Sequence, residues 1–410
     1  MTSWYADLGS DERRTLWACF GGWALDAFDL QVYTFAIPTL LGLWGISKGQ
    51  AGALQTAALL LSAFGGWIAG ILSDRFGRVR ILQVTIVWFA AFTFLSGFTE
   101  NFQQLFVCRA LQGLGFGGEW AAGAVLIGEV IRGDYRGRAV GTVQSGYAVG
   151  WGVAALLSGL IFGTFPKDTA WRVMFWIGIL PAGLVFYVRR FVHEPAVFQR
   201  AKRPPNAGFF ALIIPFFSTE YWTTTIKAVL LTTGATGGFY AFGTWLPSYL
   251  QMTRGLSVFN SSGYLTVLIV GGFIGFILGA YLADYIGRRS TFLLFAVCAA
   301  IMIFTYMFVP ITDRMMLVLG FPLGLFSNGL FAPMGPFLSE LFPTGIRATA
   351  QGFTYNAGRA VGSLFPWLVG KLSETLPLGQ AIGIFSAACY GVLIIGCLML
   401  PETKGRQLIA

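Results

Sequence analysis

The stretch GILSDRFGR at Gly70–Arg78 recurs as GAYLADYIGRR at Gly279–Arg289. Each copy lies between two long apolar stretches. A glutamate also precedes an arginine by seven residues in both parts of the chain, at Glu129–Arg136 and Glu340–Arg347. Both pairs repeat after about 210 residues (74 to 284 and 129 to 340), which indicates a chain built from two similar halves.

The composition is that of a membrane protein. Of 410 residues, 56% are hydrophobic and only 11% are charged, against about 25% charged in typical soluble domains. The mean hydropathy is +0.69, and such a chain lacks enough polar residues to cover a soluble domain. The net charge of +9 comes from basic residues in short segments between apolar stretches. This pattern indicates membrane topology, so no nucleic-acid partner is expected.

The sequence contains no pattern typical of a metal or catalytic centre. His193 is the only histidine, and no two of the five cysteines form a CxxC pair: Cys19, Cys108, Cys298, Cys389 and Cys397. We therefore expect no metal site, no cofactor and no enzymatic activity. The cysteines are interpreted as small packing residues.

The predicted fold is an all-α polytopic membrane protein. A bilayer core requires about 20 mostly apolar residues per helix, and roughly twelve such spans fit the chain: 15–43, 50–73, 81–98, 102–130, 138–165, 171–190, 227–251, 261–282, 290–310, 313–341, 349–370 and 378–400. With the repeat, they predict two pseudo-symmetric six-helix halves, 1–190 and 227–410. A linker at 191–226 joins the halves, and its stretch Phe209–Phe217 is expected to lie along the membrane surface.

The orientation follows from lysine and arginine in the short loops. One set of loops is rich in them, and the opposite set holds only Lys48, Lys167, Arg172, Arg254, Arg314 and Lys371. The positive-inside rule places the rich set in the cytoplasm. We therefore expect a multi-pass protein of the bacterial inner membrane, with both termini and the linker cytoplasmic.

The repeated stretch resembles the loop signature of the major facilitator superfamily. Arg109–Gly117 (RALQGLGFG) resembles its fourth-helix signature, and Pro401–Gly405 (PETKG) the tail of its sugar and metabolite porters. Leu25–Asp29 (LDAFD) and Gly115–Trp120 (GFGGEW) are most similar to the sialate, carboxylate and metabolite proton symporters. The resemblance covers nearly the whole chain. It implies a major facilitator fold of 12 transmembrane helices, transport by alternating access and a monomeric state.

Five ionisable residues fall within the predicted spans: Asp26, Asp29, Arg109, Glu119 and Arg359. Each charge there costs about 2.5–3.5 kcal/mol on insertion scales. Asp26 and Asp29 share one helical face, and at least one of them is expected to load and release a proton. The alternative is a permanent salt bridge to Arg109. In related porters an aspartate of the first helix pairs with the signature arginine, so the resemblance favours Asp29 with Arg109.

Glu119 is either a second proton site, a ligand for a substrate hydroxyl or a packing carboxyl. The sequence leaves open which of the three acids carries the coupled proton.

Arg359 is predicted to bind the substrate. Its guanidinium stays charged when buried and matches a carboxylate with two parallel hydrogen bonds. The alternative is a structural arginine bonded to carbonyl groups. Seven polar or aromatic residues are expected to complete the cavity: Tyr355, Asn356, Asn328, Gln144, Gln112, Tyr33 and Trp245.

The resemblance also implies two latches at the cytoplasmic face, each built from one copy of the repeated signature. Their expected members are Asp74, Arg78, Glu129 and Arg136 in the first half, and Asp284, Arg288, Glu340 and Arg347 in the second. In the family, the signature aspartate docks against a helix of the other half and stabilises the outward-facing state.

The predicted function is proton-coupled symport of a small organic anion, such as a monocarboxylate, a sialate-like acid or an aromatic acid. The expected partners are that anion, protons as the coupling ion, and the lipid bilayer. A proton-coupled symporter of a sugar, polyol or neutral metabolite and a drug/proton antiporter remain alternatives. A membrane sensor or membrane-embedded enzyme is disfavoured, because the sequence shows neither an added domain nor a nucleophile or metal constellation.

Overall fold

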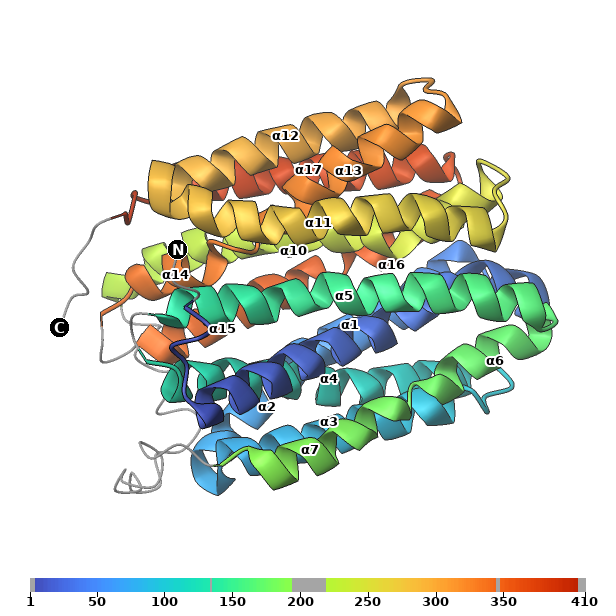
Figure 1. The fold of residues 1–410 in the computed structure, drawn as a ribbon. Helices are drawn as coiled ribbons and strands as arrows, with labels where there is room; N and C mark the ends of the chain where they lie inside the picture. The colour runs from blue at the N-terminus through green and yellow to red at the C-terminus, as the bar shows by residue number, and fades with distance from the viewer. Residues whose placement is uncertain (1–3, 133–134, 194–218, 344–346, 405–410) are drawn as a thin grey trace.

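The computed structural model describes residues 4–132, 135–193, 219–343 and 347–404, and every regular element among them is helical. The long helices run roughly parallel or antiparallel in one bundle, and the described ends of the chain lie at the same end of it (Figure 1). We name this end the terminal end and the opposite one the distal end. Helices suit a bilayer because they satisfy their backbone hydrogen bonds internally.

The first half contains seven α-helices and one 3-10 helix, in the order α1 (Ser10–Trp44), α2 (Lys48–Phe76), α3 (Arg78–Ser96), α4 (Phe102–Val130), α5 (Arg136–Thr164), α6 (Lys167–Ile177), η2 (Leu180–Gly183) and α7 (Leu184–Phe191). The second half contains α10 (Thr219–Met252), α11 (Val258–Ile286), α12 (Arg288–Phe308), α13 (Asp313–Gly329), α14 (Met334–Glu340), α15 (Arg347–Gly362), α16 (Phe365–Leu372) and α17 (Leu378–Leu398).

Three predicted spans are interrupted rather than continuous. The span at 171–190 divides into α6, η2 and α7, the span at 313–341 into α13 and α14, and the span at 349–370 into α15 and α16. Pro181, Pro333 and Pro366 lie at the three breaks. Proline has no N–H to donate to the preceding turn, which ends a continuous helix.

The linker differs from its predicted bounds. Helix α10 begins at Thr219, inside the segment 191–226 that was expected to lie between the halves. Residues 194–218 of that segment, with the stretch Phe209–Phe217, lie outside the described residues.

By length and composition, seven helical segments of the described residues are long and apolar enough to cross a membrane. Helices α1, α4 and α15 are not among these seven. They carry the five ionisable residues of the predicted spans.

The two halves are packed alike. In the first, α1 packs on α5 and α4 packs on both α2 and α3; in the second, α10 packs on α15 and α13 packs on both α11 and α12. The halves contact one another through α5 with α11 and through α2 with α15 and α16. Figure 1 shows α5 beside α11 along the length of the bundle.

Hydrogen bonds join the halves near the distal end. Thr56 Oγ1 of α2 donates to the Ser363 carbonyl at 2.7 Å and accepts from the Trp367 N–H at 3.2 Å. Lys48 Nζ donates to the Ser373 carbonyl at 3.1 Å, and the Gly49 N–H donates to Glu374 Oε1 at 3.2 Å. These contacts close the distal end between α2 and the α15–α16 region.

The repeated signature makes the same turn in both halves. Gly77, between α2 and α3, has φ 107° and ψ 147°, and Gly287, between α11 and α12, has φ 102° and ψ 158°. Essentially only glycine adopts this region, and other residues pay about 1–3 kcal/mol. The sharp reversal between the helices therefore explains the glycine of each signature.

We predict that Gly77→Ala destabilises the protein by about 1–3 kcal/mol, because alanine must adopt this backbone conformation. The measurement is the unfolding midpoint in detergent. Gly70→Ala is the matched control, since Gly70 lies inside α2 and a methyl group there meets open space. Equal midpoints for the two variants would contradict the prediction.

Candidate functional site

A cavity of about 450 Å³ lies between the two halves. Eight of its twelve lining residues are aromatic: Trp23, Phe116, Tyr147, Phe239, Tyr240, Phe276, Phe331 and Tyr355. Leu30, Gln144, Asn328 and Arg359 complete the lining. We call it the central cavity. Its mainly apolar lining with a few polar groups is typical of small-molecule sites.

Arg359 is the charged residue of this lining. Its side chain is 1% exposed, and Cζ lies 4.6 Å from the centre of the Phe116 ring. Its Nε and Nη2 atoms have no hydrogen-bond partner among the described residues. A buried charge is costly unless it is paired, so this guanidinium is suited to an anion that enters the cavity.

Four of the predicted substrate residues line the central cavity, namely Arg359, Tyr355, Asn328 and Gln144. Tyr355 and Arg359 are one helical turn apart on α15. Asn328 Nδ2 donates to the Gly324 carbonyl at 2.9 Å. The two halves thus both contribute polar groups to one cavity.

The structure places the other four away from that lining. The Tyr33 hydroxyl donates to the Ala51 carbonyl at 2.6 Å, and Trp245 Nε1 donates to the Pro366 carbonyl at 2.9 Å. Asn356 Nδ2 donates to the Gly352 carbonyl at 3.0 Å. Gln112 hydrogen-bonds Arg109 in a neighbouring cavity. Each therefore has a local partner.

Sequence reasoning missed most of the aromatic lining. One signal was present, because Trp23 and Leu30 lie seven residues apart and thus share a face of α1. Gln144 and Tyr147 are likewise three apart on α5. In a chain with 16% aromatic residues, this spacing does not by itself distinguish a cavity from a packed core.

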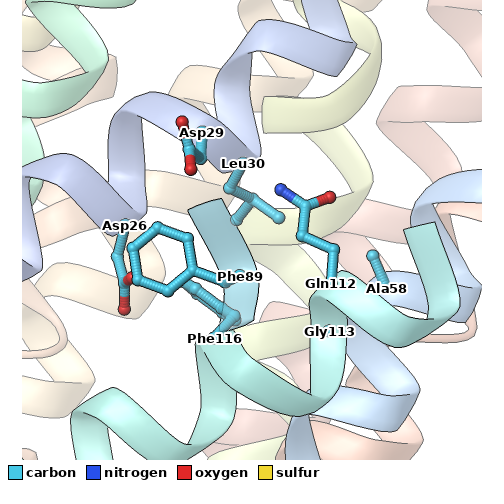
Figure 2. Close-up of a pocket in the computed structure, with 8 residues that line it drawn as sticks. All are labelled: Asp26, Asp29, Leu30, Ala58, Phe89, Gln112, Gly113 and Phe116. Carbon is cyan, nitrogen blue, oxygen red and sulfur yellow. The ribbon is translucent and has the colours of Figure 1, made fainter. Parts of the chain in front are cut away.

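A second cavity, of about 230 Å³, lies between α1, α2, α3 and α4. Its lining comprises Asp26, Asp29, Leu30, Ala58, Phe89, Gln112, Gly113 and Phe116 (Figure 2). We call it the acid chamber. Both aspartates are buried, so the chamber contains two carboxyl groups within a largely apolar lining.

Asp29 and Arg109, the pair implied by the resemblance, form no ion pair in the described part of the chain. Arg109 Nη1 donates to Gln112 Oε1 at 2.5 Å and Nη2 to Gln55 Oε1 at 2.6 Å. Asp29 Oδ2 accepts from Thr93 Oγ1 at 3.1 Å.

Two polar side chains connect this pair instead. Gln112 Nε2 donates to Thr93 Oγ1 at 2.6 Å. The single Thr93 hydroxyl proton has two acceptors in reach, the Phe89 carbonyl at 2.9 Å and Asp29 Oδ2 at 3.1 Å. When it is donated to Asp29, a chain of hydrogen bonds runs from Asp29 through Thr93 and Gln112 to Arg109. Arg109 is also held over the Tyr33 ring, with Cζ 4.8 Å from its centre. Arg109 is thus bonded by two amides and lies over a ring, while its Nε and Asp29 Oδ1 have no hydrogen-bond partner among the described residues.

Asp26 and Glu119 form a second acidic group. The two carboxyl groups share a hydrogen bond, and among the described residues no other donor reaches Asp26 or Glu119 Oε2. The charged neighbours of Asp26 are Glu119, Asp29 and Arg359. Glu119 lies against Gly22, where a methyl group would overlap with its carboxylate. Three acids thus lie close to one another near the middle of α1 and α4.

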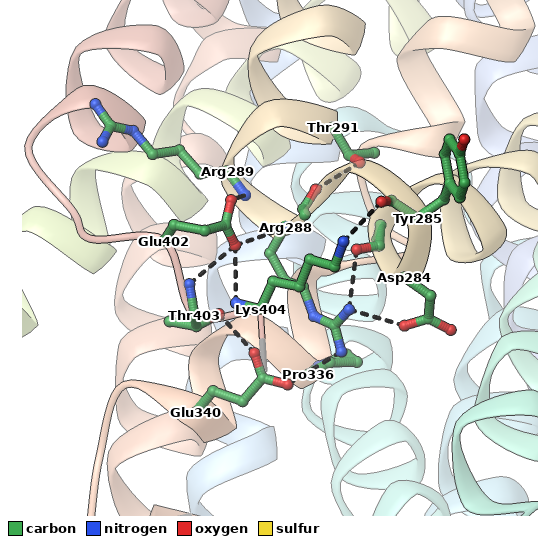
Figure 3. Close-up of polar contacts among 12 residues, drawn as sticks. Asp284, Tyr285, Arg288, Arg289, Thr291, Pro336, Glu340, Glu402, Thr403 and Lys404 are labelled. Atoms are coloured by element: carbon green, nitrogen blue, oxygen red, sulfur yellow. Dashed lines mark hydrogen bonds and ion pairs between the residues drawn. The ribbon is translucent and has the colours of Figure 1, made fainter. Parts of the chain in front are cut away.

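At the terminal end, part of each predicted latch is formed. Arg78 makes two hydrogen bonds to Glu129, Nε to Oε2 and Nη2 to Oε1, both at 3.1 Å. In the second half, Arg288 contacts Asp284 at 2.8 Å and Glu340 at 3.2 Å (Figure 3). These bonds lie within each half. The side chains of Asp74, Arg136 and Arg347 lie outside the described residues, so docking between the halves stays a prediction.

The segment after α17 joins the second network. Glu402 accepts the backbone N–H groups of Arg288 and Arg289 at the start of α12 (Figure 3). Burial by itself would raise the pKa of Glu402, but its hydrogen bonds from backbone N–H groups outweigh burial and lower that pKa. Thr403 Oγ1 donates to Glu340 Oε2 at 2.5 Å. The PETKG sequence therefore fastens the end of α17 to the α11–α12 turn.

A bundle of two similarly packed helical halves around a cavity, with ionisable groups at mid-depth, defines a polytopic membrane carrier. The chain belongs to the Major Facilitator Superfamily, whose family model matches residues 19–366. This confirms the family predicted from the repeated signatures. The protein is accordingly a multi-pass membrane transporter rather than an enzyme.

Relatives support the same class. The chain is 45% identical over 409 residues to a probable 4-methylmuconolactone transporter of Cupriavidus pinatubonensis, covering 99% of this chain and 94% of the relative. It is 30% identical over 388 residues to the cis,cis-muconate transport protein of Acinetobacter baylyi, covering 93% and 92%. A solved proton:xylose symporter bound to 6-bromo-6-deoxy-D-glucose matches with a TM-score of 0.75 at 18% identity, covering 97% of this chain and 98% of that one. At this identity the last match shows the fold alone.

We predict that Thr93→Val destabilises the protein by about 1.5–3 kcal/mol, because a hydrogen bond to a charged group is removed. Valine preserves the shape but leaves Asp29 and the Gln112 amide without their shared partner. The measurement is the unfolding midpoint in detergent. Thr85→Val on the same helix is the control, since Thr85 Oγ1 donates to the Leu82 carbonyl of its own helix. A loss no greater than in this control would refute the prediction.

Proposed function

We propose that this protein imports a small, planar, unsaturated organic acid as its monoanion, together with protons. The observation that carries the proposal is Arg359, a buried guanidinium with two unpartnered nitrogens in an aromatic cavity between the halves. A carboxylate placed there forms charge-assisted hydrogen bonds, which are about twice as strong as neutral ones.

The lining supports a flat and mostly apolar substrate body. Aromatic rings stack on unsaturated groups, whereas a sialate-like acid with many hydroxyl groups needs more hydrogen-bonding partners than this lining offers. Gln144 and Asn328 are the amides available for a polar group at the other end. Relatives whose names refer to methylmuconolactone and muconate are consistent with such an acid.

The charge balance supports a monoanion. One guanidinium can neutralise one carboxylate, while Asp26 lies among the electrostatic neighbours of Arg359 and repels further negative charge. A lipophilic cation, as in drug antiport, is disfavoured by the same arginine. An uncharged sugar would leave the guanidinium without an ionic partner.

The acid chamber supports protons as the coupling ion. A hard metal cation needs about six oxygen ligands. Most of this chamber is apolar, because five of its lining residues are Leu30, Ala58, Phe89, Gly113 and Phe116. A proton needs only a carboxyl group. In the proposed mechanism, Asp29, Asp26 and Glu119 load the proton, and Arg109 responds through Gln112 and Thr93. No other cofactor is part of the proposal.

Alternating access follows from movement of the halves about the central cavity. The terminal end, which carries the basic loops, is proposed to face the cytoplasm of a bacterial inner membrane. With the distal end closed by α2 and α16, the structure corresponds to a state that does not open outward. The bundle is proposed to act as a monomer.

The test is uptake into proteoliposomes under an imposed pH gradient. A labelled aromatic monocarboxylate competes with unlabelled monoanions, dianions, sugars and amines of similar size. Monoanions should compete, and their uptake should depend on the gradient. Competition by sugars without competition by carboxylates would overturn the substrate class.

We predict that Arg359→Lys weakens binding of the anion about ten- to hundredfold. The reason is the lost bidentate geometry, since hydrogen bonds to charged groups contribute about 1.5–3 kcal/mol. The measurement is the apparent affinity in the competition assay. Arg190→Lys, at the end of α7 and outside the cavity, is the control. If the Arg359→Lys variant binds the anion with unchanged affinity, Arg359 has a structural role and does not bind the substrate.

We predict that Asp29→Asn abolishes accumulation against a gradient but leaves substrate exchange measurable, because asparagine cannot bind and release the proton. The assay compares pH-driven uptake with counterflow at equal pH on both sides. Asp168→Asn, on the exposed first turn of α6, is the control. If accumulation persists in Asp29→Asn, the coupled proton resides on Asp26 or Glu119.

A further inference from the structure

The central cavity and the acid chamber meet at two side chains. Leu30 of α1 and Phe116 of α4 belong to the lining of both. Leu30 is 5% exposed and Phe116 is 6% exposed. Leu30 follows Asp26 by one helical turn, and Figure 2 shows Phe116 near Asp26 and below Leu30. Both are apolar, so neither of the two described side chains that the linings share can carry a proton.

Phe116 is held between two contacts of different kinds. The Trp23 ring stacks on it with the centres 6.1 Å apart and the planes at 13°. The Arg359 guanidinium lies over it, with Cζ 4.6 Å from the ring centre. Such a cation–π contact contributes modestly, and a carboxylate that binds the guanidinium competes with it. The position of the ring is therefore sensitive to what binds Arg359.

Opposite charges lie on the two sides of this boundary. On the chamber side are Asp26 and Asp29, with Glu119 and Arg109 as further charged neighbours. On the cavity side is Arg359. Asp26 shares a hydrogen bond with the Glu119 carboxyl, and Arg359 has no partner for Nε and Nη2 within the residues that the structure describes. Buried opposite charges gain energy by pairing, yet Asp26 and Arg359 are not bonded to each other.

We infer that Phe116, backed by Leu30, is a partition between the proton-binding acids and the substrate. While the cavity is empty, Arg359 and Trp23 hold the ring in place and protons do not cross from the cavity to Asp26. A substrate carboxylate draws the guanidinium off the ring, which releases Phe116 and links proton exchange to substrate binding. The substrate-dependent part of this inference rests on the proposed function, whereas the barrier to protons does not.

The test compares three substitutions of equal size in proteoliposomes with a trapped pH-sensitive dye. Phe116→Ala removes the shared ring, Phe89→Ala enlarges only the acid chamber, and Phe276→Ala enlarges only the central cavity. Without substrate, Phe116→Ala should increase proton leak at least tenfold over the wild type, while the other two stay tight. A tight Phe116→Ala, or an equal leak in all three, overturns the partition.

A second set of variants separates the barrier from folding. Phe116→Leu restores an apolar side chain without a π-face, so it should remain tight without substrate but lose the rise in proton uptake that substrate causes. Leu30→Ala should leak like Phe116→Ala. Every variant is first checked for a monodisperse peak and an unfolding midpoint close to the controls. A leaking Phe116→Leu would contradict the proposed role of the ring.

The leak assay also distinguishes this inference from the proposed function. If no organic acid drives proton uptake by the wild type, the proposed function fails, but the leak of Phe116→Ala still tests the partition. If acids drive uptake normally and Phe116→Ala stays tight and coupled, the partition fails and the proposed function stands.

Discussion

The structure depends on holding buried charged groups apart inside the helical bundle, where removing an ion from water costs free energy. Arg359 and Asp26 are both buried and form no bond to each other, and each ion removed from water costs several kcal/mol. The bundle can bear this cost because helices satisfy their own backbone hydrogen bonds, so that only side chains still need polar partners. In the proposed mechanism, a substrate anion stabilises the arginine and a proton neutralises the acids.

The two halves share their packing but differ in chemistry. Gly77 and Gly287 make equivalent turns, and α2 packs on α4 as α11 packs on α13. The acids nevertheless lie on α1 and α4, while the arginine lies on α15. The first half therefore carries the buried acids together with Arg109, and the second half carries Arg359. Movement of one half against the other changes the distance between the acids and Arg359 without changing the packing within either.

Much of this arrangement was predictable, because each charged residue in a lipid-length helix requires a reason. The sequence identified the family and the fold, and three of the five ionisable residues within the predicted spans, Asp26, Asp29 and Arg359, line the two cavities. Arg359 could be found since it stands alone in an apolar stretch. The helix breaks at Pro181, Pro333 and Pro366 were not predicted. The spans were predicted from the apolar content of about 20 residues at a time, and this measure does not register that proline lacks a backbone N–H.

The partners of each group could not be predicted from the sequence. Arg109 bonds Gln55 of α2 rather than Asp29, and Thr93 of α3 separates the expected pair. These side chains come from different helices, so only the three-dimensional packing brings them together. For the same reason Tyr33 and Trp245, which look like cavity residues, turn out to bond backbone carbonyls. Polar residues near a membrane site therefore do not by themselves define its lining.

The hydrogen bonds that close the distal end are weak enough for ligand binding to break them. Two bonds of Thr56, one of Lys48 and one to Glu374 join α2 to the α15–α16 region. At about 0.5–1.5 kcal/mol for each neutral bond of Thr56 and about 1.5–3 kcal/mol for each bond to the charged Lys48 or Glu374, the four sum to roughly 4–9 kcal/mol. Shifting a two-state equilibrium from 1:99 to 99:1 takes about 5.5 kcal/mol. In the proposed mechanism, a carboxylate on Arg359 and a proton in the acid chamber act together, each contributing the difference in its affinity for the two states. The few bonds at the distal end are thus strong enough to hold one state and weak enough for coupled ligands to release.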